Sequence, residues 1–236
     1  MAKLRLFCFP YSGGGASSFY SWVNELPSDV EIIGIQMPGL ESRLKEPPIK
    51  SVKLVVKTLE NVIYPKLNKP FAFFGHSFGA FISFELTRKL SKHYGLKPFH
   101  LFVSGIRAPQ IPDSKPSIRH LEKSAFLKEL NRRYGGITEE ISKDPDLVQE
   151  LLPGLRASIE LYESYKYVNG DPLDCPITAF GGLQDDTASQ EDLEAWRQQT
   201  KCAFTLHMIP GDHFFIHFER KQFLRLLSNE IISVCL

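Results

Sequence analysis

A serine between two glycines, in the segment Gly-His-Ser-Phe-Gly at residues 75–79, constrains the fold of this chain more than any other feature. An apolar run at 71–74 precedes it, and apolar residues at helical spacing follow it, so a tight turn between a buried strand and a helix is predicted. In such a turn the serine adopts a strained backbone conformation with its hydroxyl exposed. The N–H groups at the start of the helix point toward charge developing on a substrate oxygen. The pattern predicts a nucleophile at Ser77, with the backbone N–H of Phe78 as an oxyanion donor.

Short apolar runs alternate with helical patterns along the 236 residues. The runs are continuous rather than alternating, which is typical of strands buried on both faces. They lie at 4–9, 30–35, 71–74, 101–104, 177–180 and 204–209, and a covering helix is expected from residue 52 to about 64. This order predicts an α/β fold with a mostly parallel sheet flanked by helices. Because no internal repeat occurs, we expect one domain over residues 1–236.

The alternation stops after residue 104. No strand pattern occurs between 107 and 168, where two helical patterns, at 126–134 and 148–159, follow three prolines. A parallel crossover needs only about a dozen residues, and this segment is several times longer. We therefore expect a helical lid over about 110–168, the alternative being ordinary crossover helices that cover the sheet.

The charge balance and the cysteines exclude several classes of protein. The formal net charge is +1, with acidic and basic residues interspersed, which argues against nucleic acid or an anionic membrane as the main partner. No apolar segment is long enough for a signal peptide or a membrane span, so a cytoplasmic protein is expected. The cysteines lack C-x-x-C spacing and are expected to be reduced thiols rather than disulfide or zinc ligands; they are Cys8, Cys175, Cys202 and Cys235.

A serine nucleophile needs an imidazole to accept its proton and a carboxylate to orient that imidazole. In chains of this kind the order is serine, acid, histidine. His213 follows a turn at the carboxyl end of the last apolar run, the edge where Ser77 should emerge. His207 lies within that run, and His217 lacks the intervening glutamate of an H-E-x-x-H metal site, so no metal is expected. The other histidines are expected to be surface or packing residues: His76, His93, His100 and His120.

Two adjacent carboxylates, Asp185 and Asp186, follow the fifth apolar run. Neighbouring residues on an extended loop point in opposite directions, so only one of them can face the histidine, and the residues alone leave the choice open. The glycine-rich loop at 10–15 lacks both common phosphate-binding patterns. In an α/β-hydrolase, the fold in which such a serine turn occurs, this loop supplies the second oxyanion N–H.

Four segments together, at 9–15, 73–80, 181–196 and 210–215, resemble the type II thioesterases. These are stand-alone hydrolases associated with nonribosomal peptide and polyketide synthases, and with fatty acid synthase in animals. The resemblance covers nearly the whole chain, including 133–136 and 151–157 in the lid. It implies that Asp185 is the catalytic acid and that Ser12 is the oxyanion donor of the loop. One departure is Leu40, where the family usually has arginine.

The resemblance also implies the reaction and the partner. An acyl group would be removed from the phosphopantetheine thiol of an acyl or peptidyl carrier protein, through an acyl-Ser77 intermediate that water attacks with His213 as base. No cofactor is implied beyond the phosphopantetheine arm of the substrate, and we expect a monomer. Carriers are acidic, so basic residues near the lid are candidates for docking: Lys115, Arg119, Lys123, Lys128, Arg132 and Arg133. The alternatives are a carboxylesterase or lipase with the same triad, and a non-catalytic binding module.

Overall fold

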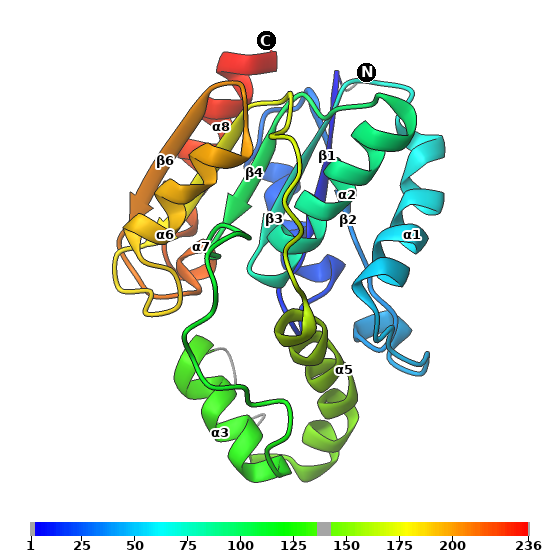
Figure 1. The fold of residues 1–236 in the computed structure, drawn as a ribbon, viewed down its shortest axis with the longest axis vertical. Helices are drawn as coiled ribbons and strands as arrows, with labels where there is room; N and C mark the ends of the chain where they lie inside the picture. Colours follow the sequence, from blue (N-terminus) through cyan, green and yellow to red (C-terminus); the bar gives the residue numbers. More distant parts are fainter. Residues whose placement is uncertain (1–2, 136–142, 236) are drawn as a thin grey trace.

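The computed structural model describes residues 3–135 and 143–235. Six strands form one sheet with the order β2-β1-β3-β4-β5-β6, and every neighbouring pair is parallel. The predicted α/β fold with a parallel sheet is thereby confirmed (Figure 1). The strands are β1 (Leu4–Phe9), β2 (Val30–Gly34), β3 (Phe71–His76), β4 (Leu101–Ser104), β5 (Ile177–Gly182) and β6 (Phe204–Ile209).

Alternate residues of the strands pack on opposite faces of the sheet, which is why the apolar runs are continuous. In β1, Phe7 and Phe9 belong to one buried cluster, whereas Leu6 and Cys8 belong to another. The first face is covered by α1 (Val52–Ile63), α2 (Phe78–Tyr94), α6 (Gln190–Glu194) and the short 3₁₀ helix η4 (Ala195–Gln199). The second face is covered by the 3₁₀ helix η1 (Ala16–Asn24), α7 (Phe215–Phe218) and α8 (Arg220–Cys235).

The order of the strands determines where a site can form. The chain leaves β1 for the edge strand β2 and then returns to β3, on the other side of β1. At this reversal the loops that follow β1 and β3 lie next to each other, because Phe9 pairs with Gly75. Ligands of open parallel sheets bind at the carboxyl ends of the strands where the order reverses. Ser77 follows β3 directly at this position.

Two helices, α3 (Lys123–Tyr134) and α5 (Pro145–Ser164), lie beyond the carboxyl ends of the strands (Figure 1). They coincide with the two helical patterns of the predicted lid. The side chain of Asp144 caps α5 by accepting the backbone N–H groups of Asp146 and Leu147. The lid has its own small buried cluster, formed by Ile118, Phe126, Leu130 and Ile159. Residues 136–142 of the predicted lid, including Gly136, lie outside the described residues.

The ends of the elements differ from the expected ones by one or two residues. β3 and β5 each extend two residues beyond their apolar runs, through His76 and through the glycines at 181–182. These extra residues still pair with the neighbouring strands, so backbone pairing rather than side-chain hydrophobicity determines where the strands end. No helix in the described part of the chain is long and apolar enough to span a bilayer.

Candidate active site

Ser77 occupies the turn between β3 and α2 in a strained conformation, with φ at 51° and ψ at −121°. Its backbone N–H donates to the carbonyl of Ser104 over 2.7 Å, which ties the turn to β4. A Cβ at Gly79 would lie 2.1 Å from the carbonyl oxygen of Phe9, and a Cβ at Gly75 would lie 2.4 Å from the Cα of Ala80. Both positions therefore require glycine, because the chain reverses against the neighbouring backbone.

Asp185 and His213 meet on two loops at the carboxyl ends of β5 and β6. The Nδ1 atom of His213 lies 2.9 Å from Oδ2 of Asp185, and the two side chains are 4% and 1% exposed. The backbone of Gln184 and that of Gly211 are hydrogen-bonded over 2.9 Å, which holds the two loops together. Two residues that are 28 positions apart in the sequence are thereby joined by a buried hydrogen bond.

Burial alone would raise the pKa of the Asp185 carboxyl. The hydrogen bond and the electrostatic attraction of His213, together with the hydroxyl and the backbone N–H of Thr187, jointly outweigh this effect, and the pKa of Asp185 is lowered. Asp185 is therefore ionised near neutral pH. An anion beside Nδ1 stabilises the imidazolium form that His213 must adopt when it accepts a proton.

The neighbouring carboxylate, Asp186, points elsewhere. Its side chain is exposed, and its backbone carbonyl accepts a hydrogen bond from Lys115 Nζ over 2.7 Å. The structure thus distinguishes the two aspartates that the residues alone leave open: Asp185 contacts the imidazole, and Asp186 lies at the surface.

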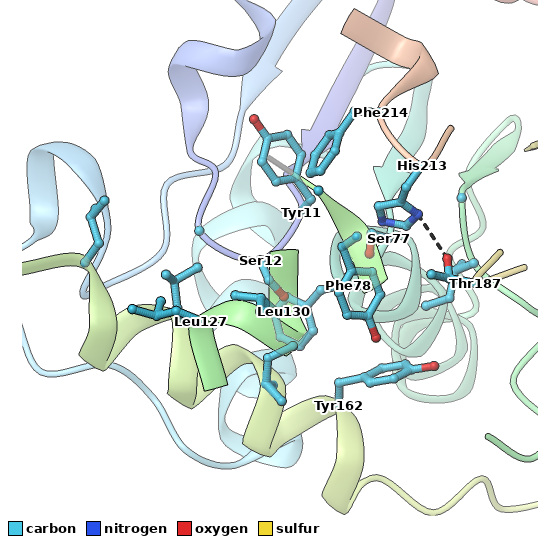
Figure 2. Close-up of a pocket in the computed structure, with 18 of the residues that line it drawn as sticks. Tyr11, Ser12, Ser77, Phe78, Leu127, Leu130, Tyr162, Thr187, His213 and Phe214 are labelled. Atoms are coloured by element: carbon cyan, nitrogen blue, oxygen red, sulfur yellow. Dashed lines mark hydrogen bonds between the residues drawn. The ribbon is translucent and has the colours of Figure 1, made fainter. Parts of the chain in front are cut away.

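Ser77 and His213 line the same cavity, which has a volume of about 230 Å³. Figure 2 shows the Ser77 side chain next to the imidazole. Within the described residues no hydrogen bond joins the Ser77 hydroxyl to His213. In ligand-free enzymes this bond is often long and tightens only when substrate is bound.

The loop after β1 forms the other side of this cavity. Ser12 and Phe78 both line it, and Phe78 is the first residue of α2, where backbone N–H groups have no acceptor within the helix. Two hydrogen bonds hold the residues that follow this loop. The backbone N–H of Ala16 donates to Gln36 Oε1 over 3.0 Å, and the Ser17 hydroxyl donates to Glu41 Oε1 over 2.5 Å. Two segments that could donate to an oxyanion thus converge beside Ser77.

The helices α3 and α5, in the predicted lid, form the apolar wall of the cavity with their aliphatic side chains (Figure 2). Tyr134, the last residue of α3, lies over the candidate base, with its ring centroid 5.2 Å from that of His213. Burial raises the pKa of Tyr134 to about 12. The aliphatic lining residues are Leu127, Leu130, Val148, Leu151, Leu155 and Ile159.

Leu40 is buried against the lid helix α5. A Cβ at Gly154 of that helix would lie 2.7 Å from Leu40 Cδ2. Nearby, the Nη1 atom of Arg43 donates to the carbonyl of Gln36 over 3.1 Å, and its other nitrogens pair with Glu46. Where the type II thioesterases usually have arginine, this chain therefore has Leu40, which makes an apolar contact with α5.

The remaining histidines fall into different environments. His217 Nε2 lies 3.2 Å from the hydroxyl of Tyr11. His76 is fully buried and its Nδ1 lies 2.8 Å from Ser104 Oγ; burial lowers its pKa well below the usual value. His93 pairs with Glu60 over 3.2 Å, and His120 is exposed.

His207 and His100 belong to a second network, formed by side chains of β5, β6 and α8 and by the residue that precedes β4. His207 Nε2 lies 2.8 Å from Glu230 Oε1, and the Thr178 hydroxyl donates to Glu230 Oε2 over 3.1 Å. His100 Nε2 lies 2.8 Å from the same hydroxyl. Burial lowers the pKa of His100 to about 4. We call His207, Glu230, Thr178 and His100 the core network.

One member of the candidate site, Thr187, was missed by reasoning from the sequence. The Thr187 hydroxyl donates to Asp185 Oδ1 over 2.6 Å. The oxygen of this hydroxyl also lies 3.1 Å from His213 Nδ1 (Figure 2). The signal that could have found it is the spacing: a threonine two residues after an aspartate often hydrogen-bonds back to that side chain. We call His213, Asp185 and Thr187 the active-edge network.

The basic residues near the lid do not all face solvent. Arg133 is 5% exposed at its side chain, where it donates to Glu129 and to the carbonyl of Pro116. It therefore stabilises the lid, and the expectation that it contributes to a docking surface is wrong. Arg132 is exposed but also pairs with Glu129.

The cysteines Cys8, Cys175 and Cys202 are free, and the side chain of Cys235 lies outside the described part of the structure.

The chain is similar in sequence and in structure to known thioesterases. The model of the thioesterase domain family matches residues 4–231. The gramicidin S biosynthesis protein GrsT of Aneurinibacillus migulanus is 45% identical over 98% of this chain and 90% of its own length. The medium-chain S-acyl fatty acid synthase thioesterase of Rattus norvegicus is 32% identical over 91% of this chain and 82% of its own. Among solved structures, RedJ, a thioesterase from the prodiginine biosynthetic pathway in Streptomyces coelicolor, superposes with a TM-score of 0.90 at 35% identity, covering 97% of this chain and 91% of RedJ.

Proposed function

The chain belongs to the thioesterase domain family, and we propose that it acts as a type II thioesterase, hydrolysing acyl groups from the phosphopantetheine thiol of a carrier protein. The relatives named above come from peptide and prodiginine biosynthesis and from fatty acid synthesis, in which acyl groups are carried as thioesters. The proposed reaction uses no cofactor other than the phosphopantetheine arm that carries the substrate.

In the first step, Ser77 Oγ attacks the thioester carbonyl carbon and its proton passes to Nε2 of His213. The carbonyl electron pair moves onto the oxygen, which accepts hydrogen bonds from the backbone N–H groups of Phe78 and Ser12. When this tetrahedral adduct collapses, the C–S bond breaks, the sulfur takes the proton from Nε2 of His213, and the thiol leaves, so that His213 is neutral again. A thiol with a pKa near 8.5 is a good leaving group, so this protonation contributes little to the rate and stabilisation of the oxyanion should dominate.

In the second step, His213 takes a proton from water, and the resulting hydroxide attacks the acyl-Ser77 ester. Collapse of the second adduct breaks the bond between the acyl carbon and Ser77 Oγ, which recovers its proton from His213. The products are a free carboxylic acid and the unchanged enzyme. Asp185 remains ionised in both steps and stabilises the imidazolium.

The observation that carries this proposal is the buried Asp185–His213 pair at the wall of the cavity that also contains Ser77. The aliphatic side chains of α3 and α5 give this cavity an apolar wall for an acyl chain. One methylene in such a pocket changes binding by only about 1 to 3 kcal/mol. Broad acyl specificity follows, and it suits an enzyme that clears assorted stalled acyl groups.

The test compares acyl-carrier thioesters with simple esters of the same acyl groups. We expect kcat/KM to be higher for the carrier thioesters, and a fluorophosphonate to label Ser77 in the wild-type protein. Ser77→Ala should lose at least about 10⁴-fold in kcat while keeping its thermal unfolding midpoint. Faster hydrolysis of the simple esters would instead favour a carboxylesterase, and full turnover by Ser77→Ala would overturn the assignment of the nucleophile.

A further inference from the structure

The hydroxyl of Thr187 lies between the carboxylate of Asp185 and the imidazole of His213. It is 2.6 Å from Asp185 Oδ1 and 3.1 Å from His213 Nδ1. The backbone N–H of Thr187 also donates to Oδ1, over 2.8 Å. One carboxylate oxygen therefore receives two hydrogen bonds from Thr187, and the other oxygen, Oδ2, is left to His213.

A count of protons fixes the direction of these hydrogen bonds. Asp185 is ionised, so both of its oxygens can only accept. The single hydroxyl proton of Thr187 is donated to Oδ1, and its oxygen then has only lone pairs to offer to His213. The Nδ1 atom of His213 faces two oxygens, that of the Thr187 hydroxyl at 3.1 Å and Oδ2 of Asp185 at 2.9 Å. A lone pair on Nδ1 would be repelled by the lone pairs of both oxygens. Nδ1 must carry the proton, which leaves the lone pair on Nε2.

We propose that Thr187 is a positioning residue for the base. Its hydroxyl orients the Asp185 carboxylate and strengthens the preference of His213 for the tautomer in which Nε2 can accept the proton of Ser77. This inference rests on the proposed function, because it concerns the same serine hydrolysis. It adds a fourth side chain, next to the three of the triad.

The surroundings of Thr187 allow a substitution to remove its hydroxyl without displacing the loop. The residue is 8% exposed and lines the cavity beside His213. Its backbone N–H would still hold Asp185 Oδ1 if the hydroxyl were removed. Replacing only the hydroxyl should therefore leave the loop in place and change the orientation of the carboxylate and the tautomer of the imidazole.

The first test removes the hydroxyl with Thr187→Val and retains it with Thr187→Ser. We expect kcat on an acyl-carrier thioester to fall roughly 10- to 100-fold in Thr187→Val, because a hydrogen bond to a charged group is lost, with KM within about twofold. Thr187→Ser should stay within about threefold of the wild type. If the valine variant does not fold, Thr187→Ala is compared with Thr187→Ser, because these two side chains differ only in the hydroxyl.

A second test asks whether Thr187 acts through the carboxylate. In an Asp185→Ala background the hydroxyl has no carboxylate to orient, so adding Thr187→Val should change kcat less than twofold. An equal fold-loss in both backgrounds, or a Thr187→Val enzyme as fast as the wild type, would overturn the proposal. These outcomes leave wild-type thioester hydrolysis intact, whereas a wild-type protein that hydrolyses no carrier thioester would refute the proposed function itself.

A spectroscopic readout is independent of turnover. The Nδ1–H proton of His213 should give a downfield ¹H resonance in the wild type, because it is hydrogen-bonded to a carboxylate. We expect this resonance to move upfield or to be lost by solvent exchange in Thr187→Val, and to be retained in Thr187→Ser. An unchanged resonance in the valine variant would show that Thr187 does not position the imidazole.

Discussion

The active-edge network and the core network use the same chemical groups for different purposes. In each, a carboxylate accepts from a threonine hydroxyl with one oxygen and pairs with a histidine through the other: Asp185 with Thr187 and His213, Glu230 with Thr178 and His207. In the active-edge network the histidine lines the cavity that contains Ser77. In the core network the threonine hydroxyl instead meets a second, buried histidine, His100.

The difference follows from where the two networks lie in the fold. Thr178 and His207 are within β5 and β6, and Glu230 comes from α8, which covers that face of the sheet. Asp185 and His213 lie on loops beyond the carboxyl ends of the same two strands. A histidine, an acid and a threonine therefore do not define a catalytic site. The active-edge network differs from the core network in lying beside a cavity that Ser77 also lines.

The largest expected effect is that of Asp185→Asn. The amide keeps the shape of the side chain but favours the wrong tautomer of His213, so kcat on an acyl-carrier thioester should fall by roughly 10⁴-fold. Steady-state kinetics measures this loss, and circular dichroism checks that the variant is folded. A folded Asp185→Asn enzyme with more than a tenth of wild-type kcat would show that the carboxylate has no role in the reaction.

The same substitution in the core network should affect stability instead. Glu230→Gln weakens the contacts of His207 and Thr178 with Glu230, and we expect the free energy of unfolding to fall by about 1 to 3 kcal/mol. The kcat of the folded variant should stay within about twofold of the wild type. Urea unfolding and steady-state kinetics on the same preparation separate the two effects. Loss of kcat without loss of stability would contradict the distinction between the networks.

The two networks should also respond to acid in different pH ranges. His100 is held neutral, with a pKa of about 4 in place of 6.5, so the unfolded chain binds more protons between these values. The free energy of unfolding should fall as the pH drops from about 6.5 to about 4, by up to roughly 1.4 kcal/mol per pH unit. Asp185 has a lowered pKa, so its contribution is lost only at lower pH.

Urea unfolding at a series of pH values measures this dependence. His100→Gln removes the titrating group, and its free energy of unfolding should change less with pH between 6.5 and 4 than that of the wild type. An identical pH dependence in the two proteins would mean that the acid sensitivity arises from groups other than His100.

The apolar runs predicted all six strands because burial on both faces of a parallel sheet leaves a strong hydrophobic signal. The turn at Ser77 was also predictable, since the glycines that it requires, Gly75 and Gly79, lie in one short motif. Spacing and order alone selected His213 among seven histidines. The strands and the turn depend on short stretches of chain, which sequence patterns describe well.

The choice between Asp185 and Asp186 could not be made from residue patterns, because it depends on the direction of two side chains on one loop. Only the resemblance to a family favoured Asp185. Thr187 was missed for a related reason: its hydroxyl contacts both Asp185 and His213 only because the loops after β5 and β6 lie next to each other. The burial of Arg133 likewise depends on packing within the lid, through Glu129 and Pro116.

The smallest expected effect is that of Asp186→Asn, which is the matched control for Asp185→Asn one residue away. The Asp186 side chain is exposed, and its interaction with Lys115 is made by the backbone carbonyl, which the substitution retains. We therefore expect kcat within about twofold of the wild type and a free energy of unfolding within about 0.5 kcal/mol. If instead Asp186→Asn lost more kcat than Asp185→Asn, the role of the acid would pass to Asp186, and a loop rearrangement during turnover would be required to bring its carboxylate to His213.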